Sequence, residues 1–401
     1  MPARVLVTGI GIISGIGKDA PGHTDSLFQS RSGISEIRYL DTLLKGTIPV
    51  SEVKFTDEEL FGLSGLPSGE IISRNTLLGI IAAGEAYRDA ELEQRKGFRT
   101  GLISATTVGG MDQCEKYYQD FLHNETRNAY IGIYDCADST EKIARFLGIT
   151  GFRTTISTAC SSAANAIMFG ARLIRQGYLD RVIAGGTESL TSFHINGFNA
   201  LKILDKDPCK PFDANRNGIT LGEGAAYIVL ESEEAARAGA SKTYAELTGY
   251  GNSCEAYHQT ASSPDGNGPF LAMSKALAVS GLKPQDIGYI NAHGTGTDNN
   301  DLSEGIAIER LFGDQIPPVS STKPFTGHTT SAAGSTEAIL CLFCLKYGVI
   351  WPNLNFRTRM PELKFAPVAE RMENVSLQHV MSNSFGFGGN DTSLVFSKVT
   401  R

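Results

Sequence analysis

Residues 4–17, RVLVTGIGIISGIG, decide the fold class of this chain. The run is apolar and is punctuated by glycines, a pattern that predicts a buried strand leading into a turn. The stretch TYAELTGYGNS, which begins at Thr243, has the same outline: a β-branched and aromatic run followed by glycines. Two such openings about half a chain apart predict an internal duplication.

Strand and helix patterns alternate along the rest of the chain. Apolar runs predict strands that end in turns or continue into helices, and amphipathic or apolar stretches predict the helices between them. The predicted segments are 181–189, 225–240, 267–281, 287–297, 331–348 and 379–398. This alternation predicts α/β layers with largely parallel sheets.

The composition is that of an ordinary globular protein. Of 401 residues, 41% are hydrophobic and 20% are charged, and the length predicts two domains or one duplicated domain. The net charge of −7 disfavours a nucleic-acid partner. Seven irregularly spaced cysteines are unlike a disulfide scaffold and predict a reduced, cytoplasmic protein. The sequence has neither a signal-peptide pattern nor a run of eighteen apolar residues, so we expect no membrane association.

The stretch STACSSAANA, residues 157–166, places Cys160 among small residues, directly before an amphipathic segment at helical spacing. Free cysteine often behaves as a small buried hydrophobe, so a packing role is one interpretation. A nucleophile is the other, because the N–H groups at a helix N-terminus lower the pKa of a thiol and can stabilise an oxyanion. The position of Cys160 leaves both interpretations open.

The stretch NAHGTGTDNND, residues 291–301, places His293 where a predicted strand ends in a loop of Gly and Thr. Strand ends present side chains to clefts, although a lone histidine is more often structural. Thr295 and Thr297 on this loop fit two roles equally well. They can hydrogen-bond an amide-bearing substrate arm, or they can simply form the turn.

The stretch SSTKPFTGHTTSAAG, residues 320–334, contains Lys323 and His328 directly before another predicted helix. Glu304, on the helix predicted after the His293 loop, is a candidate salt-bridge partner for Lys323 that would hold the geometry of a site. A solvent-exposed position is the alternative that these two residue types favour.

The stretch NSFGFGGND, residues 383–391, is a glycine-rich turn from which two phenylalanines project. It is not a phosphate loop, because no Gly-Lys-Ser/Thr follows and the turn joins two strands. One cysteine and two histidines without metal-ligand spacing favour thiol-based acyl transfer over metal chemistry.

Together, TACSSA, NAHGTGT, STKPFTGHTTSAAG and NSFGFGG resemble the β-ketoacyl-[acyl-carrier-protein] synthases in order and approximate spacing. The resemblance covers essentially the whole chain, and VMSNSFGFGG and the length are similar to the elongating enzymes of type II fatty-acid and polyketide synthesis. It implies a thiolase fold, in which two similar halves pack as five αβαβα layers. Residues 1–241 would carry the nucleophile and 242–401 both histidines. A homodimer is implied as well.

The same resemblance implies a decarboxylative Claisen condensation. Cys160 would take an acyl chain as a thioester, and His293 and His328 would assist decarboxylation of malonyl-carrier protein and stabilise the enolate, giving 3-oxoacyl-carrier protein and CO₂. No metal or organic cofactor is implied, because the phosphopantetheine arm arrives with the acyl carrier protein. The other implied roles are an ion pair of Lys323 with Glu304, an oxyanion hole from the backbone N–H groups of Cys160 and Phe387, pantetheine contacts from Thr295 and Thr297, an acyl-pocket wall at Val108, and substrate-binding aromatics at Phe385 and Phe387, the latter as a gate.

Three departures from the usual pattern lie close to these motifs. Asn390 and Asp391 stand where Thr-Asn is usual, Thr330 and Ser331 where Leu-Gly is usual, and Asp298 where Pro is usual. They leave the nucleophile in place and bear on the acyl preference. A polar pocket wall suits a polyene or polyketide intermediate better than a saturated chain.

Other interpretations predict different behaviour. A non-catalytic chain-length-factor subunit, which would form a heterodimer, keeps the fold and loses the nucleophile; the intact cysteine and histidines disfavour it. A thiolase needs a second catalytic cysteine in a Cys-Gly turn, and GFGG stands there instead. No protease signature accompanies Cys160.

Acidic carrier proteins require local basic residues. The candidates are Arg74, Arg127, Lys202 and Lys206.

Overall fold

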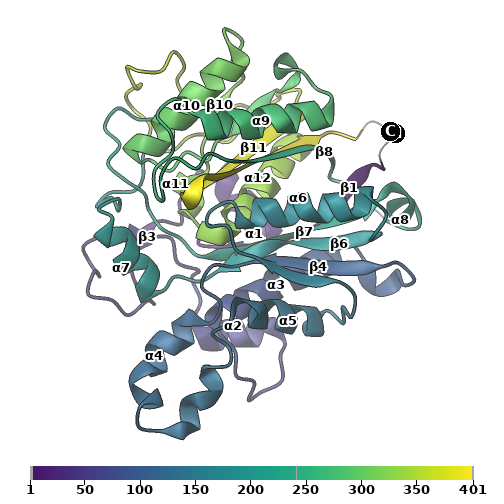
Figure 1. Cartoon of the computed structure of the whole chain (residues 1–401), viewed down its shortest axis with the longest axis vertical. Helices are drawn as coiled ribbons and strands as arrows, with labels where there is room; N and C mark the ends of the chain where they lie inside the picture. The colour runs from purple at the N-terminus through teal and green to yellow at the C-terminus, as the bar shows by residue number, and fades with distance from the viewer. Residues whose placement is uncertain (1–2, 241, 400–401) are drawn as a thin grey trace.

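The computed structural model describes residues 3–240 and 242–399, in which strands and helices alternate (Figure 1). The first half contains β1 (Val5–Ser14), α1 (Ala20–Phe28), β2 (Ser35–Glu36), β3 (Pro49–Val50), α2 (Asp57–Ser64), α3 (Arg74–Asp89), β4 (Thr100–Ala105), α4 (Met111–Phe121), α5 (Cys136–Phe146), β5 (Arg153–Ile156), α6 (Ser162–Arg175), β6 (Arg181–Glu188), α7 (Ser192–Ala200), β7 (Gly224–Ser232) and α8 (Glu233–Arg237). The second half contains β8 (Ala245–Cys254), α9 (Asn267–Ser280), β9 (Tyr289–Asn291), α10 (Asp298–Phe312), β10 (Val319–Ser320), α11 (Lys323–Thr326), α12 (Ala333–Tyr347), β11 (His379–Gly386) and β12 (Asn390–Ser397). Short 3₁₀ turns are η1 (Leu92–Gln94), η2 (Glu125–Tyr130), η3 (Pro284–Asp286), η4 (Thr330–Ala332) and η5 (Phe387–Gly389).

The main sheet contains one topology twice. Its order is β10-β9-β11-β12-β8-β1-β7-β6-β4-β5. Read outward from the centre, β1-β7-β6-β4-β5 and β8-β12-β11-β9-β10 each have two antiparallel pairings and then two parallel ones. The copies meet where β1 and β8 pair over two positions, Leu6–Glu246 and Val7–Ala245. The predicted duplication is confirmed.

The prediction of largely parallel sheets is wrong, because each half-sheet is mixed. In the second half the reason is local: the short turn η5 joins β11 directly to β12, and so short a connection can only join antiparallel strands. Residue 241, where we place the boundary between the halves, lies outside the described residues, and the division at that point stays a prediction.

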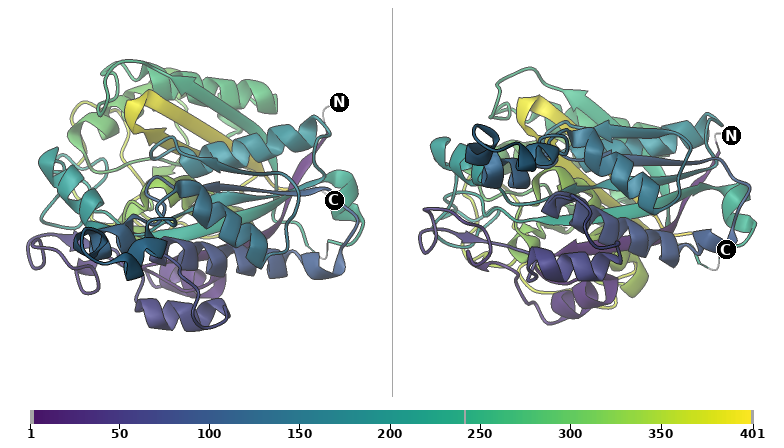
Figure 2. Two further views of the ribbon diagram at one scale, coloured as in Figure 1. Left: turned by 60° about the horizontal axis from the view of Figure 1, so that its bottom comes forward. Right: turned by 90° about the horizontal axis from the view of Figure 1, so that it is seen from below.

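The helices form three layers around the two half-sheets. Helices α3 and α5 cover the outer face of the first half-sheet, α9 and α10 cover that of the second, and α6 and α12 lie between the half-sheets (Figure 1). Each interface has its own hydrophobic core, and the largest core surrounds α6 and α12. The expected αβαβα order is therefore present. In Figure 2 the beginning and the end of the chain lie on the same side of the molecule.

Glycines in β1 and β8 explain why the two sequence openings look alike. A Cβ on Gly11 would lie 2.1 Å from a backbone oxygen of α3, and a Cβ on Gly251 would lie 2.2 Å from a backbone oxygen of α9. Gly9 and Gly249 have equally close approaches to the same helices. Each outer helix thus packs directly onto strand backbone, which only glycine permits.

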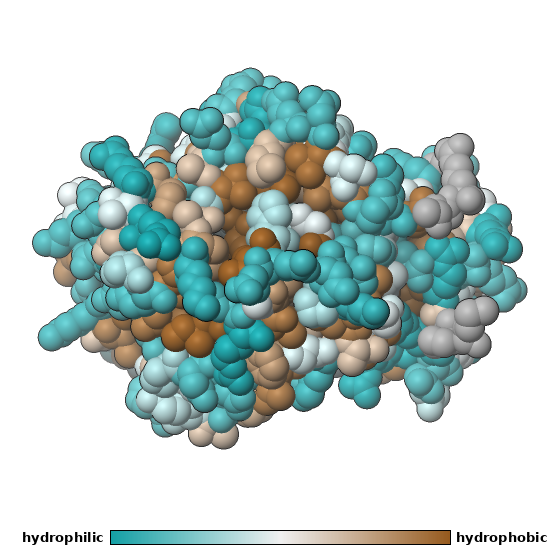
Figure 3. Space-filling model, turned by 90° about the horizontal axis from the view of Figure 1, so that it is seen from above, coloured by the Kyte–Doolittle hydropathy of each residue, from teal (hydrophilic) through white to brown (hydrophobic). Residues whose placement is uncertain are grey.

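The face shown in Figure 3 is largely hydrophilic, with apolar side chains gathered near its centre. Among the described residues we find no helix with both the length and the apolar character of a membrane span.

Candidate active site

Cys160 lies in the connection from β5 to α6, two residues before the first residue of the helix, as predicted. The preceding residue, Ala159, has a φ of +51°, a left-handed conformation that costs a non-glycine residue roughly 1–2 kcal/mol. Backbone strain of this kind gathers at functional sites. The turn places Cys160 in the wall of a cavity, with its side chain only 6% exposed.

The predicted effect of the helix N-terminus on the Cys160 thiol is wrong in sign. Burial raises the pKa of the thiol to about 11, and this outweighs the lowering by the charge of Lys323 and by the backbone N–H of Phe387. Loss of hydration disfavours a thiolate more strongly than one helix end favours it. In this structure the thiol is therefore protonated at neutral pH.

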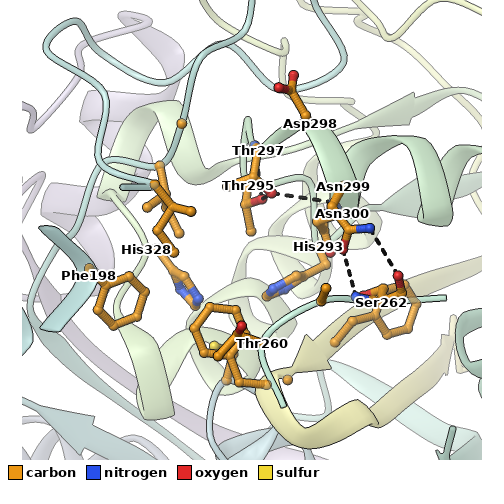
Figure 4. Close-up of a pocket in the computed structure, with 18 of the residues that line it drawn as sticks. Phe198, Thr260, Ser262, His293, Thr295, Thr297, Asp298, Asn299, Asn300 and His328 are labelled. Carbon is orange, nitrogen blue, oxygen red and sulfur yellow. Dashed lines mark hydrogen bonds between the residues drawn. The ribbon is translucent and has the colours of Figure 1, made fainter. Parts of the chain in front are cut away.

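His293 and His328 face Cys160 from the second half of the chain. A ring nitrogen of each histidine and the sulfur of Cys160 all lie within 4.8 Å of one another. The two rings are 5.2 Å apart at an interplanar angle of 84° and point into the cavity from opposite sides (Figure 4). Burial, and then the charge of Lys323, hold the pKa of both histidines well below the usual value, so both imidazoles are neutral.

Lys323 sets the hydrogen bonding of His293. Its side chain is 1% exposed, and its Nζ lies 3.2 Å from His293 Nδ1 and also contacts the backbone oxygen of His293. An ammonium group only donates, so Nδ1 accepts and the ring proton of His293 is on Nε2.

The predicted ion pair of Lys323 with Glu304 is wrong. The carboxylate bound to Lys323 is that of Glu337, on α12. Glu337 is the only acidic residue between Lys323 and Lys346, and it directly precedes the apolar run 338–345, AILCLFCL. A carboxylate buried in such a helix needs a charge partner, and this signal could have identified it.

Glu304 instead holds the loop that carries His293. Its carboxylate accepts hydrogen bonds from the backbone N–H groups of His293 at 2.9 Å and Gly294 at 2.8 Å, and from the side-chain amide of Asn383 at 3.1 Å. Burial raises the pKa of this carboxyl to about 7. Asp301 acts in the same way on the next residues, accepting from the N–H groups of Thr295 and Gly296.

A cavity of about 220 Å³ leads to the three facing groups. Thr295 and Thr297 line it, with their hydroxyl oxygens 2.9 Å apart, and Thr297 also caps α10. The turn-forming role is therefore present, and the contact with a substrate arm stays a prediction. Phe385 and Phe387 line the cavity too, and the ring of Phe387 stacks on that of Phe198 at 5.7 Å.

Comparisons with known proteins agree with this geometry. Residues 3–236 match the family model described as β-ketoacyl synthase, N-terminal domain, and residues 244–357 match the C-terminal domain. The chain belongs to the β-ketoacyl synthase family. It is 34% identical to 3-oxoacyl-[acyl-carrier-protein] synthase 2 of Staphylococcus aureus, over 98% of each chain, and 36% identical to nodulation protein E of Rhizobium meliloti, over 100% of each. The solved structure of the ishigamide ketosynthase/chain length factor has a TM-score of 0.92 and 31% identity, over 100% of each chain.

Val108 and Arg74, for which the sequence of this β-ketoacyl synthase predicts binding roles, do not line the cavity. Val108 is buried and does not line it, so its role in the acyl pocket stays a prediction. Arg74 is unsuited to carrier docking, because it is buried and bound to Glu223 and Asp57. The spacing of 149 residues between Arg74 and Glu223 gave no sign of this pair.

The other basic candidates differ in position. Lys202 is exposed and lines the cavity, Lys206 is exposed nearby in sequence, and Arg127 stacks over the ring of Tyr117.

Within residues 3–240 and 242–399, the group formed by Cys160 and the two histidines is also the set close enough to hold a metal ion. The expected absence of a metal therefore stays a prediction.

Proposed function

We propose that this β-ketoacyl synthase condenses an acyl thioester on Cys160 with malonyl-acyl-carrier protein, releasing CO₂ and 3-oxoacyl-carrier protein. The observation that carries the proposal is the convergence of the Cys160 sulfur and two neutral imidazoles within 4.8 Å, at a cavity lined by threonines and aromatic rings. A buried cysteine with only a packing role would not face two histidines in this way.

In the first half-reaction the acyl group moves from the pantetheine sulfur to Cys160. The thiol is protonated, so a neutral imidazole is needed to accept its proton as the sulfur attacks the thioester carbonyl. The carbonyl oxygen then carries negative charge, which the backbone N–H groups of Cys160 and Phe387 stabilise. The pantetheine thiolate leaves and takes the Cys160 proton from the imidazolium, which restores the neutral imidazole.

In the second half-reaction malonyl-carrier protein loses CO₂, and the electron pair of the broken bond forms an enolate on the thioester. The Nε2–H of His293 and a ring N–H of His328 are the two donors available to the enolate oxygen. The enolate carbon attacks the acyl-Cys160 carbonyl, the bond from that carbon to sulfur breaks, and the departing thiolate takes up one proton from solvent. Burial, and then the Lys323 charge, keep both histidines neutral, so that they donate hydrogen bonds without losing a net proton.

The partner we propose is an acidic acyl carrier protein that delivers its arm past Thr295 and Thr297, with Lys202 at the cavity as a contact for the carrier. We also propose that the chain acts as a dimer, with a second copy or with a related subunit. A chain length factor accompanies the ketosynthase in two of the similar structures, including one from Xenorhabdus doucetiae at a TM-score of 0.85 and 30% identity.

The first experiment is mass spectrometry after incubation with acyl-carrier proteins of several chain lengths, with Cys160→Ala as the control. We expect an acyl adduct on the peptide containing Cys160, absent from C160A. Malonyl-carrier protein should then remove it and yield a 3-oxoacyl product. Absence of an adduct with every chain would contradict the proposal and favour a partner subunit that is silent alone.

A polyene or polyketide intermediate is the second candidate for the acyl chain. Thr330 and Ser331 place buried hydroxyls two and three residues after His328, and the Thr330 hydroxyl has no partner in the described structure. We expect kcat/KM to be at least about tenfold higher for a conjugated acyl-carrier than for a saturated one of equal length, corresponding to roughly 1.4 kcal/mol. Thr330→Leu should reduce this preference. A preference for the saturated chain would exclude the second candidate.

A further inference from the structure

Asp391 is the carboxylate that the described structure leaves without hydrogen-bond partners. It lies in β12, two residues after the turn η5, and is 1% exposed. Both of its carboxylate oxygens are buried and unpartnered, which is true of no other acid among the described residues. An ionised carboxylate in such a place is costly, so its protonation state requires an explanation.

A second carboxyl, that of Glu255, lies beside it. A Cβ on Gly268 would be 2.1 Å from Asp391 Oδ2 and 2.9 Å from Glu255 Oε2, so both carboxyls pack against this glycine at the start of α9. Glu255 Oε2 accepts hydrogen bonds from the N–H and hydroxyl of Ser263, whereas its Oε1 is buried without a partner. The pair thus has donors for one oxygen of four.

The surrounding charges are negative. The charged groups that act on Asp391 are Glu255 and, from α10, Glu304; with burial they raise the pKa of Asp391 to about 8. No lysine or arginine within the described ranges forms an ion pair with any of the three acids. The cations on the adjoining helices are engaged elsewhere: Lys275 of α9 donates to a backbone oxygen of β8, and Arg310 of α10 donates to the backbone oxygen of Asp265.

The carboxyl pair joins two segments that form the cavity. The backbone N–H of Glu255 donates to the oxygen of Gly389 at 3.0 Å, and the N–H of Gly388 donates to the oxygen of Gln259 at 2.7 Å. The segment 255–262 contributes part of the cavity wall. The turn η5 on the other side carries the Phe387 N–H that contacts the Cys160 sulfur.

We propose that Asp391 and Glu255 share one proton, and that the resulting carboxyl–carboxylate hydrogen bond positions the turn η5 against Cys160. Two adjacent buried carboxylates cannot both ionise without strong repulsion, and one shared proton removes both the repulsion and the missing donor. When the proton is lost, segment 255–262 and η5 separate and the Phe387 N–H moves away from the sulfur. The two acids are positioning residues, and the effect on catalysis rests on the function proposed above.

A proton fits this place better than a metal ion. A cation with oxygen ligands takes six or more of them, and among the described residues no third carboxylate, imidazole or thiol lies close enough to ligate together with the pair: the described group of three lies at Cys160 instead. A bound cation would make stability depend on that cation, which the experiment below includes as an outcome.

The first readout is thermal stability, which does not require activity. Because the pKa of Asp391 is raised in the folded state, its stabilising contribution is complete below about pH 4 and is lost as the pH rises through about 8. Asp391→Asn cannot ionise and still donates to Glu255. We therefore expect the melting temperature of D391N minus that of wild type to rise by at least about 2 °C between pH 5 and pH 9. Asp314→Asn, at an exposed acid of the same half, is the control and should show no such rise.

The second readout is the rate at which Cys160 is acylated. The ratio of the wild-type rate to the D391N rate cancels effects of pH on the thiol and on the substrate. We expect this ratio to fall about tenfold from pH 7 to pH 9, because a group of pKa about 8 is then roughly 90% ionised. Glu255→Gln, which supplies its own donor, should flatten the same profile.

Each outcome has a distinct meaning. A constant melting-temperature difference from pH 5 to pH 9 would show that Asp391 is ionised throughout and would overturn the shared proton. A wild-type melting temperature that rises with added Na⁺, K⁺ or Mg²⁺, and does so less in D391N, would overturn it in favour of a cation. If the temperatures diverge as expected but Cys160 is acylated in neither protein at any pH, the shared proton stands and the proposed condensation fails.

Discussion

Helices α6 and α12 occupy equivalent places in the two halves of the chain, yet only one of them is sealed from water. On α6, one face packs in the core while Arg172 is exposed. On α12, all the residues from Ala333 to Leu345 are buried. Each helix follows a residue that lines the cavity: Cys160 precedes α6, and His328 precedes α12.

The difference separates two kinds of chemistry. The partly exposed helix α6 follows Cys160, which in the proposed function receives a bulky acyl chain from outside. The sealed helix α12 carries Glu337, whose carboxylate pairs with Lys323 and so fixes an ammonium group against His293. A charge pair can hold so exact a position because no water competes for it, whereas an exposed pair would be screened. The duplication thus supplied two similar scaffolds, and burial decided what each can hold.

The largest effect should come from breaking the charge pair on α12. Glu337→Gln keeps the shape of the side chain and leaves the Lys323 ammonium buried without a counter-charge, which costs about 3–5 kcal/mol. We expect the free energy of unfolding in urea to fall by that amount. The matched change on α6, Arg172→Gln, removes an exposed charge and should cost less than about 0.5 kcal/mol.

The double variant K323M/E337L tests the cause. Replacing both partners with apolar side chains removes the unpaired charge, so stability should recover most of the loss even though His293 loses its donor. If E337Q unfolds at the same urea concentration as the wild type, the Lys323–Glu337 pair does not stabilise the fold. The proposed energetic difference between α6 and α12 would then be wrong.

A smaller effect is expected where the two helices cross. A Cβ on Gly334 of α12 would lie 2.6 Å from the backbone nitrogen of Ala164 on α6. A helix backbone cannot move aside as a side chain can, so the added methyl group would clash. Gly334→Ala should therefore cost about 1–3 kcal/mol. On α6, a Cβ on Gly170 would meet only side chains, at 3.0 Å and beyond, and alanine favours a helix. Gly170→Ala should be close to neutral in the same unfolding measurement; equal losses would show that the crossing is not tight.

Sequence patterns predicted what local spacing determines. Strands β1 and β8 both contain glycines that let an outer helix pack against strand backbone, and this pattern is visible in the sequence. The position of Cys160 before α6 follows from the small residues and the helical period around it. The alternation of strands and helices predicts α/β layers. It does not predict which neighbouring strands run parallel and which antiparallel, because this depends on how the chain connects them.

The errors concern residues far apart in sequence or deep in the core. Proximity to His293 in the chain favours Glu304 as the partner of Lys323, whereas the path of α12 brings Glu337 there. A helix end alone predicts a lowered pKa for the Cys160 thiol, and burial, which no local pattern reveals, raises that pKa instead. The sequence around Arg74 gives no sign that Glu223 and Asp57 lie beside it.

The smallest expected effect concerns a feature that the two helices share. Each is entered through a left-handed residue other than glycine: Ala159 before α6 has a φ of +51°, and Thr330 before α12 has a φ of +45°. Ala159→Gly relieves roughly 1–2 kcal/mol of strain and adds about 0.5–1 kcal/mol of backbone entropy to the unfolded chain, so the free energy of unfolding should rise by at most about 1.5 kcal/mol. Ala163→Gly, inside the first turn of α6, has no such strain to relieve and should lose about 1 kcal/mol. If both variants lower the free energy of unfolding by the same amount, the turn before Cys160 stores no strain. The two helix entries would then share a backbone conformation without sharing an energetic cost.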